Sequence, residues 1–169
     1  HLKYYHIKSI DLYRSAKKIL LDYDAEVKKE TVEEITSGIE TTVISSKGDY
    51  RGERIFDSRP PMSHKKLSKD QNILQSFVGY KIKLKNKVFN PEVCTLMDFN
   101  VQQQGHTQFF YVLPFSESTA LVELTRFGTE PISKSESKAI IDDYICKKFG
   151  PYDLVEIELG VVPMYMDLC

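Results

Sequence analysis

The sequence is poor in cysteine and contains no long hydrophobic run. Its three cysteines, Cys94, Cys146 and Cys169, are odd in number and include no C-x-x-C pair, which predicts free thiols that serve as packing residues in a reducing compartment. The longest apolar runs, "FFYVLPF" and "GVVPM", are far shorter than the roughly 20 residues that a membrane-spanning helix needs. Because the opening residues also lack the apolar segment of a secretory signal, we expect a cytoplasmic protein.

The motifs of self-contained nucleotide enzymes are also missing. No G-x-G-x-x-G, G-x-x-x-x-G-K-[ST] or G-x-S-x-G pattern occurs, so these residues contain no recognisable phosphate cradle and no serine-hydrolase elbow. The four histidines share no ligand spacing with one another or with a cysteine, and we expect no metal site. The formal net charge of −1 argues against bulk binding to nucleic acid.

The hydrophobic pattern of the first third predicts one helix followed by a small sheet. Residues 10–21 have the spacing of a helix with one apolar stripe, and Ser9 or Asp11 could cap its start. Residues 25–57 contain three clusters rich in β-branched residues, separated by serine-glycine and lysine-glycine turns, which predict a three-stranded meander. The proline-rich residues 59–70 then predict a loop.

The rest of the chain predicts a larger sheet and a second helix. Four strands are expected between residues 73 and 127, arranged as sequential antiparallel hairpins. A helix is expected near residues 134–148, with Ser133 as its cap, before a last apolar strand, "LVEIELGVV". The fold class expected is therefore α+β, with a mostly antiparallel sheet and two flanking helices.

Glu123 is the first candidate for chemistry. Alternation along "ALVELTRF" puts it beside Leu121, Thr125 and Phe127 on one face of the strand. A carboxyl group in such apolar surroundings has a raised pKa and can act as an acid near neutral pH. The alternative is an ordinary strand glutamate, exposed or paired with Arg126 or with a neighbouring strand.

Asp98 is the second candidate, on the polar side of the strand "VCTLMDFNVQ". In sequential hairpins it could neighbour Glu123, and two carboxyl groups so placed can share a proton or divide acid and base roles. Simple solvation of that face is the alternative. Asp57 and Arg59, in "FDSRPP", could pair with each other or fix the Pro60-Pro61 corner, and an isolated motif of this kind is more often structural.

Aromatic residues are concentrated in the predicted larger sheet. Most of them must form ordinary core, but any that line a cleft could stabilise a cation through their electron-rich faces and surround a long apolar ligand. The set comprises Phe77, Tyr80, Phe89, Phe99, Phe109, Phe110, Tyr111, Phe115 and Phe127.

Five segments, taken in order, resemble the central part of the lycopene cyclase family of flavoproteins. They are "FDSRPP", "LQSFVGYKIKL", "FNPEVCTLMDFNV", "FFYVLPFSESTALVELTRF" and "IELGVVPM", and together they span about residues 50–164. The resemblance implies an FAD domain of the aromatic-hydroxylase type, interrupted by a sheet that covers the substrate. About residues 1–60 would belong to the FAD-domain-like region and about 70–164 to the substrate sheet of a single fragment, without the glycine-rich flavin segments expected before and after it.

The resemblance also implies an activity and a set of residues. The family cyclises the linear end of lycopene without net redox change, although it requires reduced FAD, which we do not expect this fragment to bind. Glu123 would be the acid or the counter-charge of the carbocation, assisted by Asp98, while Asp57 and Arg59 would stand near the flavin. The residues expected to contact a carotenoid or other long apolar substrate are Phe99, Phe110, Tyr111, Phe127 and Glu158.

Two departures from the family pattern keep other functions open. Leu124 stands where a second acidic residue is common, and Leu159 replaces a frequent polar residue after Glu158. Another FAD-dependent enzyme, a hydroxylase or reductase acting on an apolar substrate, would share the sheet without needing Glu123. A non-catalytic module that binds apolar ligands is the third interpretation. Peripheral contact with a membrane is compatible with all three, and the sequence gives no oligomeric state.

Overall fold

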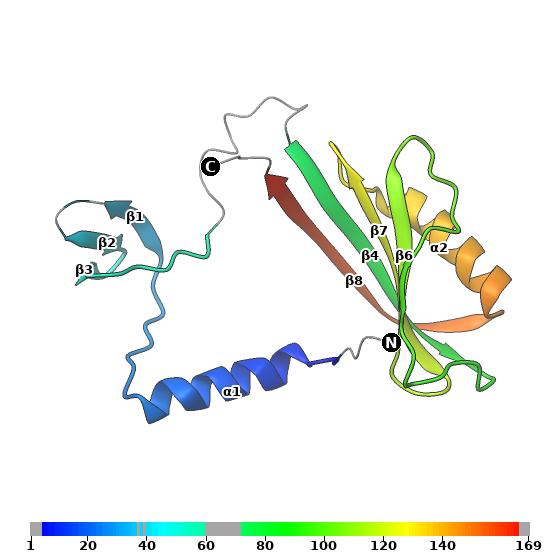
Figure 1. Cartoon of the computed structure of the whole chain (residues 1–169), viewed down its shortest axis with the longest axis horizontal. Coiled ribbons are helices and arrows are strands. Elements are labelled where there is room, and N and C mark those ends of the chain that lie inside the picture. Colours follow the sequence, from blue (N-terminus) through cyan, green and yellow to red (C-terminus); the bar gives the residue numbers. More distant parts are fainter. Residues whose placement is uncertain (1–4, 37, 39, 60–71, 166–169) are drawn as a thin grey trace. The chain divides into compact units, whose positions relative to one another are not determined.

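The computed structural model describes residues 5–36, 38, 40–59 and 72–165. The chain divides into two compact units, His1–Arg59 and Pro60–Cys169, which are described separately here (Figure 1). Antiparallel sheets and two helices confirm the predicted α+β class. The division falls at the predicted proline-rich loop, most of which lies outside the described residues.

The first unit contains helix α1 and a three-stranded meander. Helix α1 spans Ser9–Asp22, close to the predicted residues 10–21. Its N-cap is Lys8, which makes no side-chain capping bond, so the predicted cap was wrong; Asp11 instead pairs with Arg14 at 3.4 Å. Strands β1 (Val32–Thr36), β2 (Thr41–Ser45) and β3 (Gly48–Gly52) follow in antiparallel order β1-β2-β3, which confirms the meander.

A carboxylate at the entry to the meander organises its second turn. Glu30 accepts hydrogen bonds from the hydroxyls of Ser45, at 2.5 Å, and Tyr50, at 2.9 Å. The Ser45 hydroxyl also lies 2.8 Å from the Gly48 carbonyl, to which it can donate. The Lys28 ammonium lies 4.6 Å from the centre of the Tyr50 ring. These side chains therefore join the ends of a sheet that is too small to have a large core of its own.

The second unit is a five-stranded antiparallel sheet with one helix on it. The strand order is β5-β6-β7-β4-β8, so β5, β6 and β7 are sequential hairpins, as predicted. β4, however, pairs with β7 and β8 and is not a neighbour of β5, which corrects the expected sequential order. The elements are β4 (Asn72–Leu84), β5 (Thr95–Asp98), β6 (Thr107–Pro114), β7 (Thr119–Gly128), α2 (Lys134–Lys148) and β8 (Tyr152–Tyr165).

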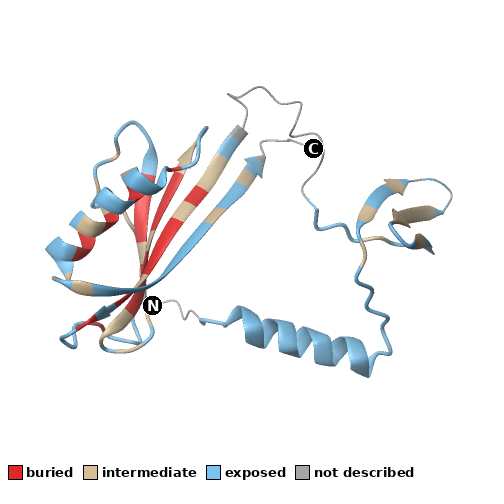
Figure 2. Cartoon of the chain, turned by 180° about the vertical axis from the view of Figure 1, so that it is seen from behind, coloured by how far each residue is buried: buried red, intermediate tan, exposed pale blue. Residues whose placement is uncertain are grey.

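The core of this unit lies between α2 and one face of the sheet (Figures 1 and 2). Alternation along the strands turns every second side chain toward the helix, and Ile82, Phe110, Val122 and Leu124 are fully buried there. The ring of Phe110 stacks on Tyr144 of α2, with 3.8 Å between centroids. Each such side chain contributes about 1.5–3 kcal/mol by leaving water, so the helix-side face supplies most of the stability of this unit.

Polar contacts fasten the start of α2 to the sheet. The Ser133 hydroxyl accepts a hydrogen bond from the backbone N–H of Glu136, which confirms the predicted cap. Arg126 of β7 is buried and donates to Gln108 Oε1 at 2.9 Å and to Glu136 Oε1 at 2.6 Å. The buried guanidinium is thus satisfied by one residue of β6 and one of α2, which fixes the helix over these two strands.

The cysteines agree only in part with their predicted role. Cys94 and Cys146 are free, as expected. Cys146, however, is exposed on α2 and is not a packing residue, and Cys169 lies outside the described residues. Within the described ranges, no helix has both the length and the apolar character to cross a membrane.

Gly160 of β8 is required for the packing of Phe77, its partner on β4. A methyl group at Gly160 would lie 2.0 Å from Cζ of Phe77, so the ring would have to move. We expect Gly160→Ala to lower the free energy of unfolding by about 1–3 kcal/mol, measured by urea denaturation. The penalty should shrink in the background of Phe77→Ala, because the clash is then gone.

Gly48→Ala is the matched control, because a methyl group there meets only the Tyr50 hydroxyl, at 3.8 Å. A cost of Gly160→Ala no larger than that of Gly48→Ala, or one unchanged in the Phe77→Ala background, would show that the contact does not constrain the strand.

Candidate functional site

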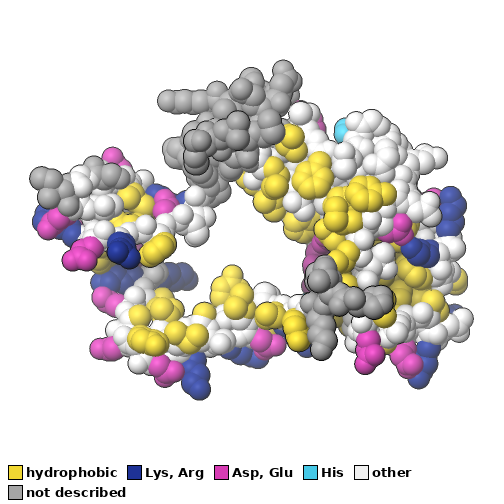
Figure 3. Space-filling model, in the orientation of Figure 1, with side chains coloured by type: hydrophobic (Ala, Val, Ile, Leu, Met, Phe, Trp, Pro, Cys, Tyr) yellow, Lys and Arg dark blue, Asp and Glu magenta, His cyan; other side chains and the backbone are white. Residues whose placement is uncertain are grey.

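The candidate site is the face of the five-stranded sheet that α2 does not cover, named here the open face. It carries the odd-numbered side chains of β4, β6 and β7, because the even-numbered ones point toward the helix. Figure 3 looks at this face and shows hydrophobic side chains gathered over its strands. Apolar side chains gathered on one exposed sheet face are typical of a surface that binds a partner or a ligand.

One row of residues crosses the open face with two carboxylates in it. The strand register aligns Tyr111, Glu123, Gly79 and Glu158 on β6, β7, β4 and β8. A methyl group at Gly79 would lie 3.6 Å from Glu123 Oε2 and 3.6 Å from Cβ of Glu158. The two glutamates therefore flank a buried glycine, and the end of the Leu121 side chain, 2.9 Å from where that methyl group would be, lies closest to it.

The surroundings of Glu123 favour its protonated form. The side chain is half-buried, and burial is the main cause that raises the pKa of this carboxyl; the negative charge of Glu158 adds to the rise, while a hydrogen bond from Thr125 opposes it. Thr125 Oγ1 donates to Glu123 Oε1 at 3.3 Å. The alternative partner, Arg126, points to the opposite face and pairs with Glu136. A carboxyl group with a raised pKa on an apolar face is a candidate for proton transfer, which makes Glu123 the first residue to test.

Aromatic rings cover the open face on one side of this row. Phe109 lies at their centre, with ring centroids 5.1 Å from Phe99, 5.2 Å from Tyr111 and 6.2 Å from Phe127. The neighbouring row of the open face contains Phe77 of β4, whose ring lies against its partner Gly160 on β8. The structure therefore brings Phe99, Tyr111 and Phe127 to the same face as Glu123, with electron-rich rings that can stabilise a cation.

On the other side of the row the open face becomes charged. Lys81 of β4 is the next residue along that face after Gly79, and its Nζ lies 3.4 Å from Glu156 Oε2 on β8. The same ammonium is 5.7 Å from the centre of the Phe115 ring. Glu123 and Glu158 thus stand between the aromatic half and a row that runs from Leu113 and Leu121 to the Lys81–Glu156 ion pair, which is the charged end of the same face.

Phe110 and Leu124 belong to the opposite face. Phe110 is fully buried under Tyr144 of α2, so it is not available to a ligand on the open face. Leu124 is its cross-strand partner and is also fully buried. The residue after Glu123 therefore contributes to the helix-side core and takes no part in the chemistry of the open face.

Asp98 does not come near Glu123, although the sequence suggested that it could. β6 separates its strand from β7, and its carboxylate faces α2, where it accepts hydrogen bonds from Tyr144 at 2.7 Å and Lys148 at 2.5 Å. The bond from Lys148, followed by that from Tyr144, lowers the pKa of Asp98 to about 2. An ionised, paired carboxylate of this kind fastens the end of the helix.

Asp57 and Arg59 pair with each other in the first unit. The Arg59 guanidinium donates to Asp57 at 2.9–3.2 Å, and its Nη1 donates to the Val32 carbonyl at 3.1 Å. This hydrogen bonding lowers the pKa of Asp57. Since these donors are already occupied, the pair does not present an open phosphate site.

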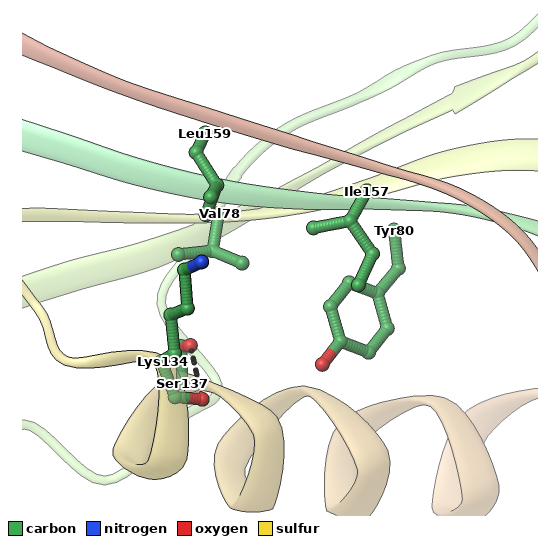
Figure 4. Close-up of a pocket in the computed structure, with 6 residues that line it drawn as sticks. All are labelled: Val78, Tyr80, Lys134, Ser137, Ile157 and Leu159. Atoms are coloured by element: carbon green, nitrogen blue, oxygen red, sulfur yellow. Dashed lines mark hydrogen bonds between the residues drawn. The ribbon is translucent and has the colours of Figure 1, made fainter.

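A small hollow lies on the helix side of the sheet, between α2 and the edge strand (Figure 4). Its volume of about 180 Å³ is below the roughly 300–1,000 Å³ typical of ligand pockets. No three metal-ligating side chains come together in the part of the chain that the structure describes. The lining residues are Val78, Tyr80, Lys134, Ser137, Ile157 and Leu159.

Gly79 and Gly160 are the two residues of the open face whose close contacts the sequence interpretation missed. A glycine inside an otherwise regular strand is the available signal, because it commonly marks a place where another group approaches the backbone closely. Gly79 is approached by Glu123 and Glu158, and Gly160 by Phe77.

Comparisons with known proteins agree with these observations. A family model described as lycopene cyclase protein matches residues 1–167. No match was found among curated proteins. A crystal structure of a geranylgeranyl bacteriochlorophyll reductase-like protein from Thermoplasma acidophilum is similar, with a TM-score of 0.63 at 14% identity. The match covers 90% of this chain and 41% of that one, so this chain spans about two-fifths of the larger fold.

Burial of Glu123 predicts a pH-dependent cost to stability. Its pKa is higher in the folded than in the unfolded state, so folding is favoured at low pH and loses stability as pH rises from the unfolded value through the folded one. We expect Glu123→Gln to equal the wild type near pH 4 and to exceed it in free energy of unfolding at pH 8. Urea denaturation across this range tests the sign, and a constant difference between the two proteins would contradict it.

The lowered pKa of Asp98 predicts the opposite pH dependence for the stability that this residue contributes. Its pKa of about 2 lies below the value of about 3.9 in an unfolded chain, so its stabilisation is present above about pH 4 and is lost as pH falls toward 2. Allowing for the partial exposure of Lys148, we expect Asp98→Asn to cost about 1–2 kcal/mol at pH 6. The cost should shrink to a small fraction at pH 2, where the carboxyl group is about half protonated, and vanish near pH 1 in the same denaturation assay. A cost at pH 2 as large as that at pH 6 would show that the carboxylate charge is not responsible.

Proposed function

We propose, from the premise that this chain belongs to the lycopene cyclase protein family, that its open face binds the linear end of a carotenoid and closes it into a ring without net redox change. The observation that carries the proposal is Glu123, a half-buried carboxyl with a raised pKa beside a group of aromatic rings. Such a carboxyl keeps its proton to a higher pH than an exposed glutamate and can deliver it to an apolar substrate.

The proposed reaction begins with proton transfer from Glu123 to a terminal carbon–carbon double bond. The resulting carbocation is attacked by a neighbouring alkene of the same chain, which closes the ring. Loss of a proton from a ring carbon then restores a double bond, so one proton enters and one leaves. After donation the Glu123 carboxylate becomes a counter-charge for the cation in a site of low dielectric constant.

The aromatic rings support this function by excluding water from the cation. Phe109 is buried by its neighbours Phe99, Tyr111 and Phe127, which form a continuous apolar surface next to Glu123. A ring face attracts a cation by about 0.5–2 kcal/mol, more when both are desolvated. Water could capture the cation as an alcohol, so its exclusion favours the cyclic product.

The aromatic half and the charged end of the open face differ in how well they accept hydrocarbon, which determines how a long apolar substrate would lie. The long apolar chain would lie over the aromatic half, with its reacting end at Glu123. The Lys81–Glu156 ion pair at the other end is a poor surface for hydrocarbon, because contact would strip water from both charges. This arrangement suits a substrate whose reacting group is the terminus of a long apolar chain.

FAD in its reduced form would complete the active protein, as the family requires. It would supply a reduced, electron-rich ring system beside the substrate without net electron transfer. Because the donors of Arg59 are occupied by Asp57 and the Val32 carbonyl, we propose that residues outside this pair bind the phosphates of the flavin. The steps assigned above involve this chain's residues only.

A reductase acting on an isoprenoid double bond is the second candidate. The Thermoplasma acidophilum protein is named a geranylgeranyl bacteriochlorophyll reductase-like protein, and its name refers to a long isoprenoid chain. Such a reductase could use the same apolar face without a carboxylic acid at Glu123. A non-catalytic module that binds apolar ligands would also use the apolar open face, but it gives the raised pKa of Glu123 no role. Analysis of the products separates the candidates, since cyclic, reduced and unchanged chains differ in mass or chromatographic retention.

The test is the substitution Glu123→Gln in the full natural chain that contains these residues, assayed with reduced FAD and lycopene in detergent. Glutamine keeps the size and hydrogen bonding of the side chain but carries no acidic proton. We expect ring formation to fall by about 10²–10⁴-fold, as measured by pigment chromatography.

Glu92→Gln, the same chemical change at an exposed loop residue, is the matched control and should keep the wild-type rate. Cyclisation at the wild-type rate in Glu123→Gln would contradict the assignment of the acid. Reduction of the linear chain in place of cyclisation would favour the reductase.

A further inference from the structure

We propose that Glu158 is a second catalytic residue, the base that takes the proton from the ring carbon, and that the reacting end of the substrate lies in the gap over Gly79. The inference rests on the proposed function and adds a division of labour between two carboxyl groups. It assigns chemistry to an edge-strand residue that contributes little to the core.

The strand register provides the first argument. Glu123 and Glu158 are both cross-strand partners of Gly79, one from each side, so all three residues lie in one row on the open face. Adjacent strands are about 4.8 Å apart, which places the two glutamate backbones about 10 Å from each other. Both side chains point to the same side of the sheet, and an alkene end can lie between two carboxyl groups at this separation.

Gly79 provides the second argument, because it places no side chain of its own between the two glutamates, and the nearest atom over it is the end of the flexible Leu121 side chain. A methyl group there would lie 3.6 Å from Glu123 Oε2, 3.6 Å from Cβ of Glu158 and 2.9 Å from Cδ1 of Leu121. The gap is thus bordered by one carboxyl oxygen and by apolar atoms. Any other residue at this position would fill the place where the two carboxyl groups can reach the same ligand.

The two carboxyl groups have different environments, which provides the third argument. Glu123 is half-buried, whereas Glu158 is exposed on the edge strand. Among the described residues, neither forms an ion pair with lysine or arginine, and the nearby Lys81 is bound to Glu156. Burial raises the pKa of the Glu123 carboxyl, and two carboxyl groups in environments as unlike as these can divide the roles of acid and base.

The reaction needs no proton donor or acceptor other than Glu123 and Glu158, because one proton is given and one is taken back. Glu123 loses its proton to the terminal alkene carbon and becomes a carboxylate. After ring closure the Glu158 carboxylate removes a proton from the carbon next to the cation, and that C–H electron pair becomes the new double bond. Transfer of this proton to Glu123, directly or through water, restores the starting state.

The first experiment replaces Glu158 with Gln in the full natural chain, assayed with reduced FAD and lycopene. Without the base, the cation forms but is lost by other routes, so water capture or removal of a different proton should yield hydroxylated products or altered double-bond isomers. We expect the normal cyclic product to fall by at least about 10²-fold, with these side products appearing in the chromatogram. Asp153→Asn, on the same strand, is the matched control and should leave the product pattern unchanged.

The second experiment fills the gap with Gly79→Ala. The added methyl group approaches the end of the Leu121 side chain, which can rotate away, so we expect the protein to fold. Ring formation should fall by at least about 10-fold, because the methyl group occupies the position proposed for the substrate. Thermal unfolding checks the fold, and Gly48→Ala is the matched control.

The outcomes separate this inference from the proposed function. If the wild type forms no ring, or if Glu123→Gln cyclises normally, the proposed function fails. If Glu123→Gln is inactive while Glu158→Gln keeps the wild-type rate and product pattern, the proposed function stands and the role of Glu158 is refuted. Wild-type ring formation by folded Gly79→Ala would refute the placement of the substrate. Loss of the normal product with side products in Glu158→Gln supports the base.

Discussion

The pairing of β4 with β7 on one edge and β8 on the other is the interaction on which the second unit depends. β4 is followed along the chain by β5, β6 and β7, yet in the sheet it lies between β7 and β8. Ten residue pairs join β4 to β7, from Leu74↔Gly128 to Lys83↔Thr119. A slip of one residue would move Glu123 to the helix side and Leu124 to the open face. The register therefore fixes the fold and the chemistry together.

The two faces of this sheet have different roles: the helix side contains the stabilising core, and the open face contains the candidate site. The helix side contains the fully buried core and satisfies its polar groups, as the Arg126 contacts to Gln108 and Glu136 show. The open face instead accommodates a carboxyl group with a raised pKa beside apolar rings, which is unfavourable for folding at neutral pH. The stability supplied by the core is what allows the open face to carry such a group.

Local patterns predicted the elements well, and long-range pairing much less well. Helix α2 occupies the predicted residues because Ser133 caps it and its apolar spacing is regular. The faces around Glu123 also followed from simple alternation along β7. The position of β4 was not predictable in this way, because nothing local in "ILQSFVGYKIKL" states which strands will flank it.

The misplacement of Asp98 has a different physical cause. Alternation assumes a regular strand, but β5 is only four residues long and its register shifts between Thr95 and Asp98. Met97 has a φ of 55°, which breaks the pleat at that point. Both Thr95 and Asp98 are therefore paired with residues of β6 that face α2, Val112 and Phe110. A sequence pattern of alternating residues does not reveal such a bulge.

The same alternation resolves the question that Leu124 raised. An acidic residue beside Glu123 would belong to an acid–base site only if both side chains reached the same face. Adjacent strand residues point to opposite faces, and Leu124 is fully buried against Phe110 and Val78 on the helix side. Leucine at this position thus removes no acid from the open face. The second carboxyl group of that face comes from a different strand, because Glu158 is brought to Glu123 by their common partner, Gly79.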